Sequence, residues 1–261
     1  MRKPLIVGNW KMYKTITEAE DYVAQIKDRL PAKQVAEVEL AVPTLFLQSL
    51  ARLTAASPLK IVAENCFYQD EGAFTGETSP LALRELGIKH VILGHSERRR
   101  LFFESDQVVN QKVHAALSAG LCPILCVDET MKRLAEHGQV AWVVNQVITG
   151  LAGVSEDQLA HIVIAYEPSW AIGTGKAAAS PVEANEGCYL IRQTVACLYG
   201  EAAANRVRIL YGGSVNQANL PQLIGRPDID GVLIGRASLD PATFLTMVDQ
   251  VVAASGGEAS A

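Results

Sequence analysis

The sequence predicts an α/β protein, folded as a single (β/α)8 barrel in which helices surround eight parallel strands. Three observations support this fold class. Apolar runs of strand length recur eight times, segments with helical spacing separate them, and the composition does not change along the 261 residues. Barrels of about 250 residues form one domain. We therefore expect one barrel over residues 1–252 and a disordered tail over residues 253–261, AASGGEASA.

The expected strands are runs of β-branched and other apolar residues, which suit parallel strands buried on both faces. They are Leu5–Val7, Val38–Val42, Lys60–Ala63, His90–Leu93, Pro123–Val127, Ile162–Ala165, Val207–Leu210 and Gly231–Ile234. A doubly wound open sheet is the main rival arrangement. However, GxGxxG, the strongest sign of its dinucleotide-binding half, does not follow the first run.

The segments between these strands have the apolar spacing of amphipathic helices, as at Ala19, Tyr22, Val23 and Ile26. Three helix starts are indicated by capping residues: Thr17 with Glu20, Ser180 with Glu183 after Pro181, and Asp240 before Pro241. Strand and helix are therefore expected to alternate along the whole chain.

The charge balance and the cysteines restrict the class of protein. A net charge of -5 argues against binding to nucleic acid or to an anionic membrane surface. No apolar run approaches the roughly 20 residues of a membrane helix, and the first residues contain too few apolar side chains for a secretory signal. The five cysteines show no CxxC spacing, so we expect reduced thiols in a cytoplasmic protein.

In a barrel of this kind the active site lies at the carboxyl ends of the strands. The residues that follow the expected strands there include Asn9 and Lys11, His95 and Glu97, Glu167, Gly212 to Ser214, and Gly235 with Arg236. A cation, an imidazole, a carboxylate and two small-residue turns would thus meet at one rim.

Glu167 is the candidate general base. It ends the strand that begins near residue 162, and Pro168 favours extended geometry at this position, which would hold the base of the side chain where the strand ends. The loop that follows contains Gly173 and Gly175, which can absorb large backbone changes. A fixed carboxylate beside a movable lid suits proton abstraction away from water.

His95 precedes a segment that can start a helix, with Ser96 as the expected cap. The positive end of a helix dipole disfavours an imidazolium, so we expect His95 to be neutral and to donate a hydrogen bond. The turns after strands seven and eight are typical places for phosphate, bound through backbone N–H groups. Neither the P-loop pattern nor a metal-ligand spacing occurs, so we expect chemistry without a metal or cofactor.

Five motifs, in their order along the chain, resemble those of the triosephosphate isomerase family, and the resemblance covers about residues 5–250. They are Asn9-Trp10-Lys11, the GAFTGE loop at 72–77, GHSERR at 94–99, AYEP at 165–168 with WAIGTGK at 170–176, and YGGSV at 211–215. The resemblance implies a TIM barrel that interconverts dihydroxyacetone phosphate and D-glyceraldehyde 3-phosphate through an enediolate, in glycolysis and gluconeogenesis.

The resemblance also implies roles for individual residues. Glu167 would move the proton, His95 would polarise the carbonyl with help from Asn9, and Lys11 would offset the growing negative charge. Glu97 would support the same network. The substrate phosphate would be bound by backbone N–H groups, those of Gly173, Ser214, Gly235 and Arg236.

The family resemblance further implies a homodimer formed through the long loop at residues 65–79. Thr75 would approach the region of the partner's Lys11 and the partner's His95. Glu77 would pair with Arg98 of the partner subunit.

Two positions depart from the family pattern, which commonly has glycine at Asp128 and at Arg236. Two alternative functions stay open at this point. One is another phosphate-binding barrel enzyme, such as a sugar-phosphate epimerase, or an aldolase that uses Lys11 for a Schiff base. The other is a non-catalytic scaffold that binds triose phosphate.

Overall fold

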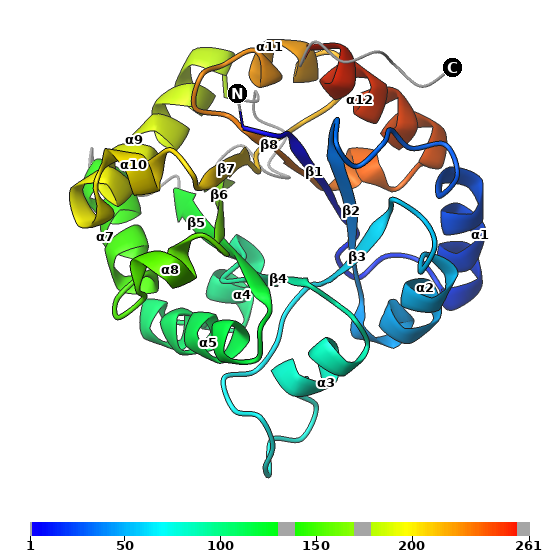
Figure 1. Cartoon of the computed structure of the whole chain (residues 1–261), viewed down its shortest axis with the longest axis horizontal. Coiled ribbons are helices and arrows are strands. Elements are labelled where there is room, and N and C mark those ends of the chain that lie inside the picture. The colour runs from blue at the N-terminus through cyan, green and yellow to red at the C-terminus, as the bar shows by residue number, and fades with distance from the viewer. Residues whose placement is uncertain (1, 130–138, 170–178, 255–261) are drawn as a thin grey trace.

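The computed structural model describes residues 2–129, 139–169 and 179–254, and it confirms the expected fold class (Figure 1). Eight parallel strands follow one another in chain order and close into a barrel, because the first strand pairs with the last. The strands are β1 Leu5–Asn9, β2 Glu37–Val42, β3 Lys60–Ala63, β4 His90–Leu93, β5 Cys122–Glu129, β6 Val163–Pro168, β7 Arg208–Tyr211 and β8 Gly231–Ile234.

Helices surround this barrel on the outside, as Figure 1 shows. The longer ones are α1 Ile16–Ile26, α2 Leu47–Leu53, α5 Asp106–Ser118, α7 Gln139–Gly150, α9 Pro181–Tyr199 and α12 Pro241–Ala254. The shorter ones are η1 Thr44–Phe46, α3 Pro80–Glu85, α4 Ser96–Leu101, α8 Glu156–Leu159, α10 Glu201–Ala204, α11 Leu220–Ile224 and η3 Arg236–Ser238. Among the described residues, no helix combines the length and the apolar character needed to cross a membrane.

The strands have two buried faces, which explains their nearly continuous apolar sequences. Along β5, Ile124 and Cys126 belong to the core inside the barrel, whereas Leu125 and Val127 belong to the core between the barrel and the helices. Each strand alternates between the two cores with the period of two that strand geometry imposes. Buried polar side chains of the strands therefore lie mainly near strand ends, as Asn9, Asp128 and Glu167 do, with Glu39 inside β2 as an exception.

The first helix start was predicted two residues too late. Helix α1 is capped by Thr15, which forms a capping box with Glu18, whereas Thr17 lies inside the first turn. Lys14 has a positive φ of 74°, so the chain turns directly before Thr15 and the helix begins there. The capping box of Ser180 with Glu183 is confirmed, and Asp240 accepts a hydrogen bond from the backbone N–H of Thr243.

Two element ends also differ from the sequence-based expectation. Strand β6 continues through Glu167 and Pro168, so the candidate base lies within the regular strand. Helix α12 extends through Ala254, so residues 253 and 254 are helical and do not belong to the tail. The apolar residues Val251 and Val252 of its last turns are buried, which keeps this end of the helix on the barrel.

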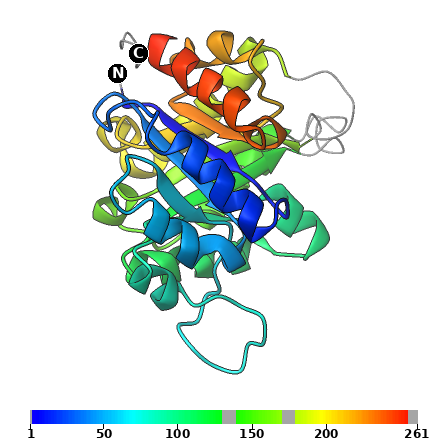
Figure 2. The ribbon, with the colours of Figure 1, turned by 90° about the vertical axis from the view of Figure 1, so that its right-hand side faces the viewer.

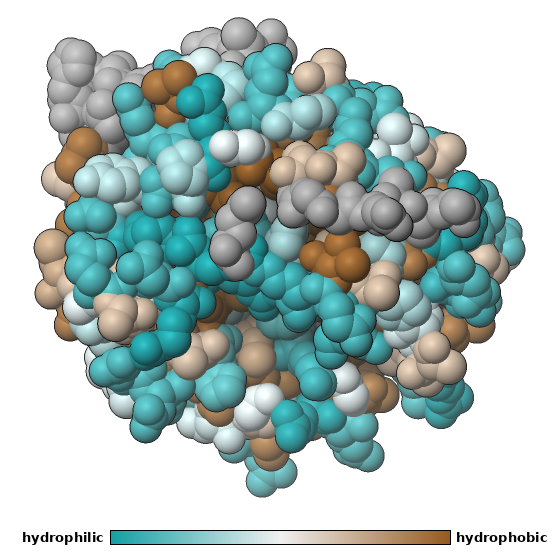
Figure 3. Space-filling model, turned by 45° about the horizontal axis from the view of Figure 1, so that its top comes forward, coloured by the Kyte–Doolittle hydropathy of each residue, from teal (hydrophilic) through white to brown (hydrophobic). Residues whose placement is uncertain are grey.

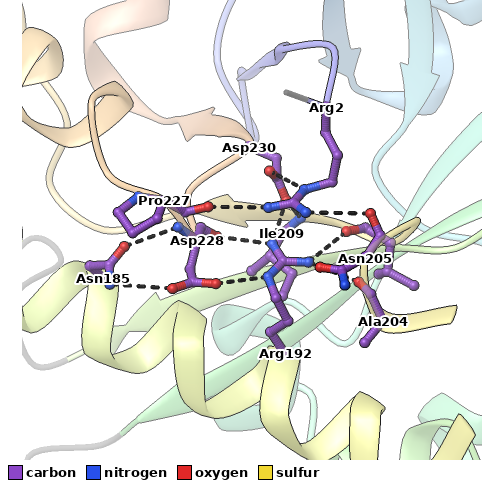
Figure 4. A network of polar contacts seen from close by, with 10 residues as sticks. Arg2, Asn185, Arg192, Ala204, Asn205, Ile209, Pro227, Asp228 and Asp230 are labelled. Carbon is purple, nitrogen blue, oxygen red and sulfur yellow. Dashed lines mark hydrogen bonds and ion pairs between the residues drawn. The ribbon is translucent and has the colours of Figure 1, made fainter. Parts of the chain in front are cut away.

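A buried polar network around Arg192 of α9 stabilises the amino ends of the last two strands (Figure 4). Arg192 is only 5% exposed, and its guanidinium pairs with Asp228 at 2.8 Å and with Asp230 at 2.7 Å and also donates to backbone carbonyls. Asp230 accepts a further hydrogen bond from Arg2, directly before β1. This network therefore ties the start of the chain to the amino ends of β7 and β8, opposite the strands' carboxyl ends.

The segment between β3 and α3 projects from the barrel as a long loop (Figures 1 and 2). Phe67 stacks against Phe74 with ring centroids 4.6 Å apart, and the Phe67 N–H donates to Thr78 across the base of the loop. Residues 69–77 at its tip are exposed. The face in Figure 3 is mostly hydrophilic, with hydrophobic residues scattered over it.

Candidate active site

The carboxyl ends of β1 and β4 are joined through an ion pair. Lys11, two residues after the end of β1, places its Nζ 2.6 Å from Oε1 of Glu97 in α4. Lys11 has a positive φ of 54°, an unusual conformation for a residue other than glycine. The Asn9 side chain accepts a hydrogen bond from the Lys11 N–H at 3.2 Å and so holds this turn. Local backbone geometry therefore directs the ammonium toward the rim.

Glu167 is fully buried at the carboxyl end of β6, and both of its carboxylate oxygens have a neighbour. Oε2 accepts a hydrogen bond of 2.8 Å from the backbone N–H of Ser96, and Oε1 lies 2.8 Å from Nε2 of His95. The candidate base and the candidate electrophile thus contact each other directly, as expected for residues that meet at one rim.

His95 caps helix α4 with its own side chain, so the prediction that Ser96 is the cap was wrong. The imidazole Nδ1 accepts a hydrogen bond from the N–H of Glu97 at 3.2 Å, and His95 has extended geometry while Ser96 is already helical. His95 stands in the N-cap position, one residue before Ser96, so its imidazole takes the role expected for the Ser96 hydroxyl. A lone pair on Nδ1 places the ring proton on Nε2, which faces Glu167.

The charges of this pair depend on each other. Burial alone would raise the pKa of Glu167, but the facing His95 and the hydrogen bonds from Ser96 lower it below the ordinary value. Burial lowers the pKa of His95, and the carboxylate of Glu167 outweighs this and raises it. The pKa of His95 is raised because its imidazole contacts the Glu167 carboxylate. A neutral imidazole during the reaction therefore stays a prediction.

The glycine turns after β7 and β8 lie against the same groups. A Cβ atom on Gly212 would lie 3.1 Å from Cγ of Glu167, and one on Gly235 would lie 3.9 Å from Nζ of Lys11. Glycine at 212 therefore lets the backbone approach the base, whereas a side chain at 235 would be in ordinary contact with the ammonium. Ser214 is half-buried beside the first turn, and Arg236 is exposed at the start of η3. Gly173 and the rest of the expected lid lie outside the described residues.

Two carboxylates beside the site, the half-buried Glu64 and the buried Asp128, were missed in the sequence. Glu64 follows β3, and burial raises its pKa to about 8 although the backbone of Lys11 and the charge of His95 lower it. Asp128, which was recognised only as a departure from the family, is 5% exposed near the end of β5. Both follow the rule that polar residues at carboxyl ends of strands reach the rim, and applying it to β3 and β5 would have identified them.

The donors in the described part of the chain do not form a metal site. No group of three or more His, Cys, Asp or Glu side chains is close enough together there to bind a metal ion. The described site residues are instead suited to proton transfer: a carboxylate, an imidazole with its proton on Nε2, and an ammonium. Chemistry without a metal or cofactor stays a prediction.

Comparisons with known proteins agree with this geometry. The family model described as triosephosphate isomerase matches residues 4–251. The triosephosphate isomerase of Lactiplantibacillus plantarum is 49% identical over 249 residues, which cover 95% of this chain and 98% of that protein. The corresponding protein of Latilactobacillus sakei is 47% identical over 248 residues, with 95% and 98% covered. On its barrel, its site and these similarities, the chain belongs to the triosephosphate isomerase family.

Proposed function

We propose that this protein interconverts dihydroxyacetone phosphate and D-glyceraldehyde 3-phosphate by proton transfer through an enediolate. Its family and relatives of this name support the reaction, which belongs to glycolysis and gluconeogenesis. The strongest structural support is the contact of 2.8 Å between His95 and Glu167, beside the Lys11–Glu97 pair on the same rim. Neither another phosphate-binding barrel enzyme nor a binding scaffold is favoured by these similarities.

Glu167 is the base that takes a proton from the carbon beside the carbonyl and returns it to the neighbouring carbon. Both of its oxygens have partners in Ser96 and His95, so the carboxylate must leave Ser96 to reach a substrate. Burial removes water from around it, which strengthens its basicity once those hydrogen bonds are exchanged.

His95 polarises the substrate carbonyl through Nε2–H. The hydrogen bond from Glu97 N–H to Nδ1 fixes the ring and its tautomer, so that Nε2–H points into the site. Asn9 and Lys11 act beside it: the ammonium offsets the negative charge that grows on the enediolate oxygens. Glu97 holds that ammonium at 2.6 Å and so fixes its position.

The phosphate is bound by backbone N–H groups of Gly173, Ser214, Gly235 and Arg236. The approach of Gly235 to Lys11 supports this placement, because it brings the end of β8 beside the ammonium. Backbone donors at glycine turns suit an oxyanion with several acceptors.

The protein is a cytoplasmic homodimer that associates through the loop at residues 65–79. Exposed apolar side chains follow four consecutive strands, β1 to β4, and therefore gather on one side of the barrel; they are Met12, Leu45, Phe74, Phe102 and Phe103. Met12 is 95% and Phe103 is 85% exposed, which is unusual for a surface that does not bind a partner. Thr75 and Glu77 at the loop tip contact the partner subunit. Arg98 already pairs with Glu104 at 2.6 Å, so Glu77 would have to share it.

The reaction is tested with purified protein and glyceraldehyde 3-phosphate, coupled to NADH oxidation by glycerol-3-phosphate dehydrogenase. Rapid NADH loss is expected for the wild type, and Glu167→Gln is expected to lose nearly all activity. Binding of triose phosphate without turnover would favour the scaffold. Trapping of substrate on Lys11 by borohydride would favour the aldolase.

For the dimer, sedimentation should give twice the chain mass; a fully active monomer would refute it.

A further inference from the structure

Asp128 and Glu167 are direct neighbours on adjacent strands. They pair in register between β5 and β6, where parallel strands lie about 4.8 Å apart. Two residues earlier on each strand, Cys126 and Ala165 both belong to the core inside the barrel. Because side chains alternate along a strand, Asp128 and Glu167 share that inner face at the carboxyl end.

The position of Ser96 directs the side chain of Glu167 toward β5. Ser96 follows β4, and β5 lies between β4 and β6 in the barrel. The side chain of Glu167 therefore crosses the end of β5 to accept the Ser96 N–H at 2.8 Å. Asp128, in register with Glu167, lies beside this path, and together with Ser96 it lines a cavity of about 450 Å³ that residues of α4, α5 and α7 also line. Movement of Glu167 toward Lys11, across the barrel at β1, would increase its distance from Asp128.

Asp128 is held firmly in this place. Gln146 of α7 accepts from its backbone N–H at 3.0 Å and donates to its carbonyl at 2.8 Å. The side chain is 5% exposed, and its Oδ1 has no hydrogen-bond partner among the described residues. Trp142 and Gln146 also stabilise its charged form.

Arg99, the cation that lowers the pKa of Asp128, forms no ion pair with it within the described structure. Arg99 of α4 donates to the carbonyls of Gly94 and Cys126 and forms its ion pair with Asp106. Burial raises the pKa of Asp128 and the charge of Glu167 raises it further, while Arg99 lowers it. Asp128 and Glu167 therefore act on each other as like charges in a buried space.

We propose that Asp128 is a positioning residue for the base: its carboxylate repels that of Glu167 and favours the movement of Glu167 from Ser96 toward the substrate. This inference rests on the proposed isomerase function, in which Glu167 must leave Ser96. Repulsion has two consequences, because like charges destabilise each other at short range. It weakens the Ser96-bound position, and it makes Glu167 a stronger base.

The test compares wild-type protein with Asp128→Asn, Asp128→Gly and Asp128→Glu, measuring kcat and KM from pH 5 to 10. Asp128→Asn and Asp128→Gly should lower kcat about 3- to 10-fold at neutral pH with KM nearly unchanged. In the plot of kcat against pH, the acidic limb of both variants should move to lower pH by about one unit. Asp128→Glu, which keeps the charge, should restore the wild-type limb. Asp157→Asn on the exposed helix α8 removes the same charge and should change neither value.

The proposal would be overturned if Asp128→Asn kept the kcat of the wild type and its acidic limb did not move. A change in KM alone would also overturn it. A merely structural role would make Asp128→Glu as defective as Asp128→Asn, and this outcome also refutes it. If the variants do not fold, carbon-13 NMR of glutamate-labelled wild-type protein decides. The Glu167 carboxyl signal, assigned with Glu167→Gln, should shift a second time as Asp128 ionises, and a single step refutes coupling. An inactive wild-type protein would instead contradict the proposed function, and the NMR titration would still report on the pair.

Discussion

Replacement of Arg192 by methionine is expected to destabilise the fold severely. The guanidinium is almost completely buried and joins Asp228, Asp230 and the carbonyls of Ala204 and Val207. Methionine fills similar space but donates no hydrogen bond. Asp230 keeps its hydrogen bond from Arg2, whereas Asp228 loses its ion-pair partner.

The magnitude follows from this loss. Removing one partner of a buried ion pair costs about 3–5 kcal/mol, because the other charge stays buried without compensation. For a chain of this size about 1 kcal/mol corresponds to 2 °C or more in Tm. We therefore expect Tm to fall by about 6–10 °C in thermal unfolding followed by circular dichroism at fixed protein concentration.

The matched control is Arg206→Ala. Arg206 forms an ion pair of 2.6 Å with Glu156, but the two side chains are 53% and 57% exposed. Exposed pairs contribute about 0–1 kcal/mol, so its Tm should change by less than about 2 °C. Equal shifts for both variants, or a Tm of Arg192→Met within 2 °C of wild type, would refute the reasoning that burial decides the cost.

Three further predictions concern other parts of the molecule. Glu167→Asp moves the carboxylate back by about one bond length. In the coupled assay kcat should therefore fall about 100-fold or more, with KM within about 3-fold of wild type. A change in KM alone would mean that another group is the base. Burial lowers the pKa of His90, but the Glu39 carboxylate 2.8 Å from its Nδ1 raises it to about 10. Stability from this pair is therefore full below about pH 6.5 and is lost as the pH rises toward 10; urea unfolding should show this slope in wild type and a smaller one in His90→Gln. Gly187→Ala should destabilise α9 by about 1–3 kcal/mol in urea unfolding, because its Cβ would lie 2.2 Å from the buried ring of Tyr166; a gain in stability would show that helix propensity wins.

The barrel could be predicted well because its strands have a strong local signal. Runs such as Ile162–Ala165 are apolar at every position, which only burial on both faces explains. Helix starts depend on finer detail. Ser180 was placed correctly because Pro181 and Glu183 follow it in one consistent pattern, whereas Thr15 and Thr17 each have a glutamate three residues later, and the turn at Lys14 decides between them.

The sequence predicted which residues reach the rim of the barrel. It did not predict how these residues contact one another. His95, Glu167 and Lys11 were predicted to lie together because each follows or ends a strand, and the carboxyl ends of parallel strands share one edge. The sequence could not show that the imidazole caps α4, or that Ser96 gives its N–H to Glu167, because both depend on distances between separate strands.

The pairing of β1 with β8 has a consequence for synthesis of the protein. Arg2 contacts Asp230 across 228 positions, and the first strand pairs with β8, the last strand of the barrel to be translated. One edge of β1 therefore has no partner while the ribosome is still making the chain before residues 231–234. Such edges pair readily with other chains. The nascent protein thus stays prone to aggregate until β8 has been made, and a chaperone that covers extended apolar segments would protect it over that whole period.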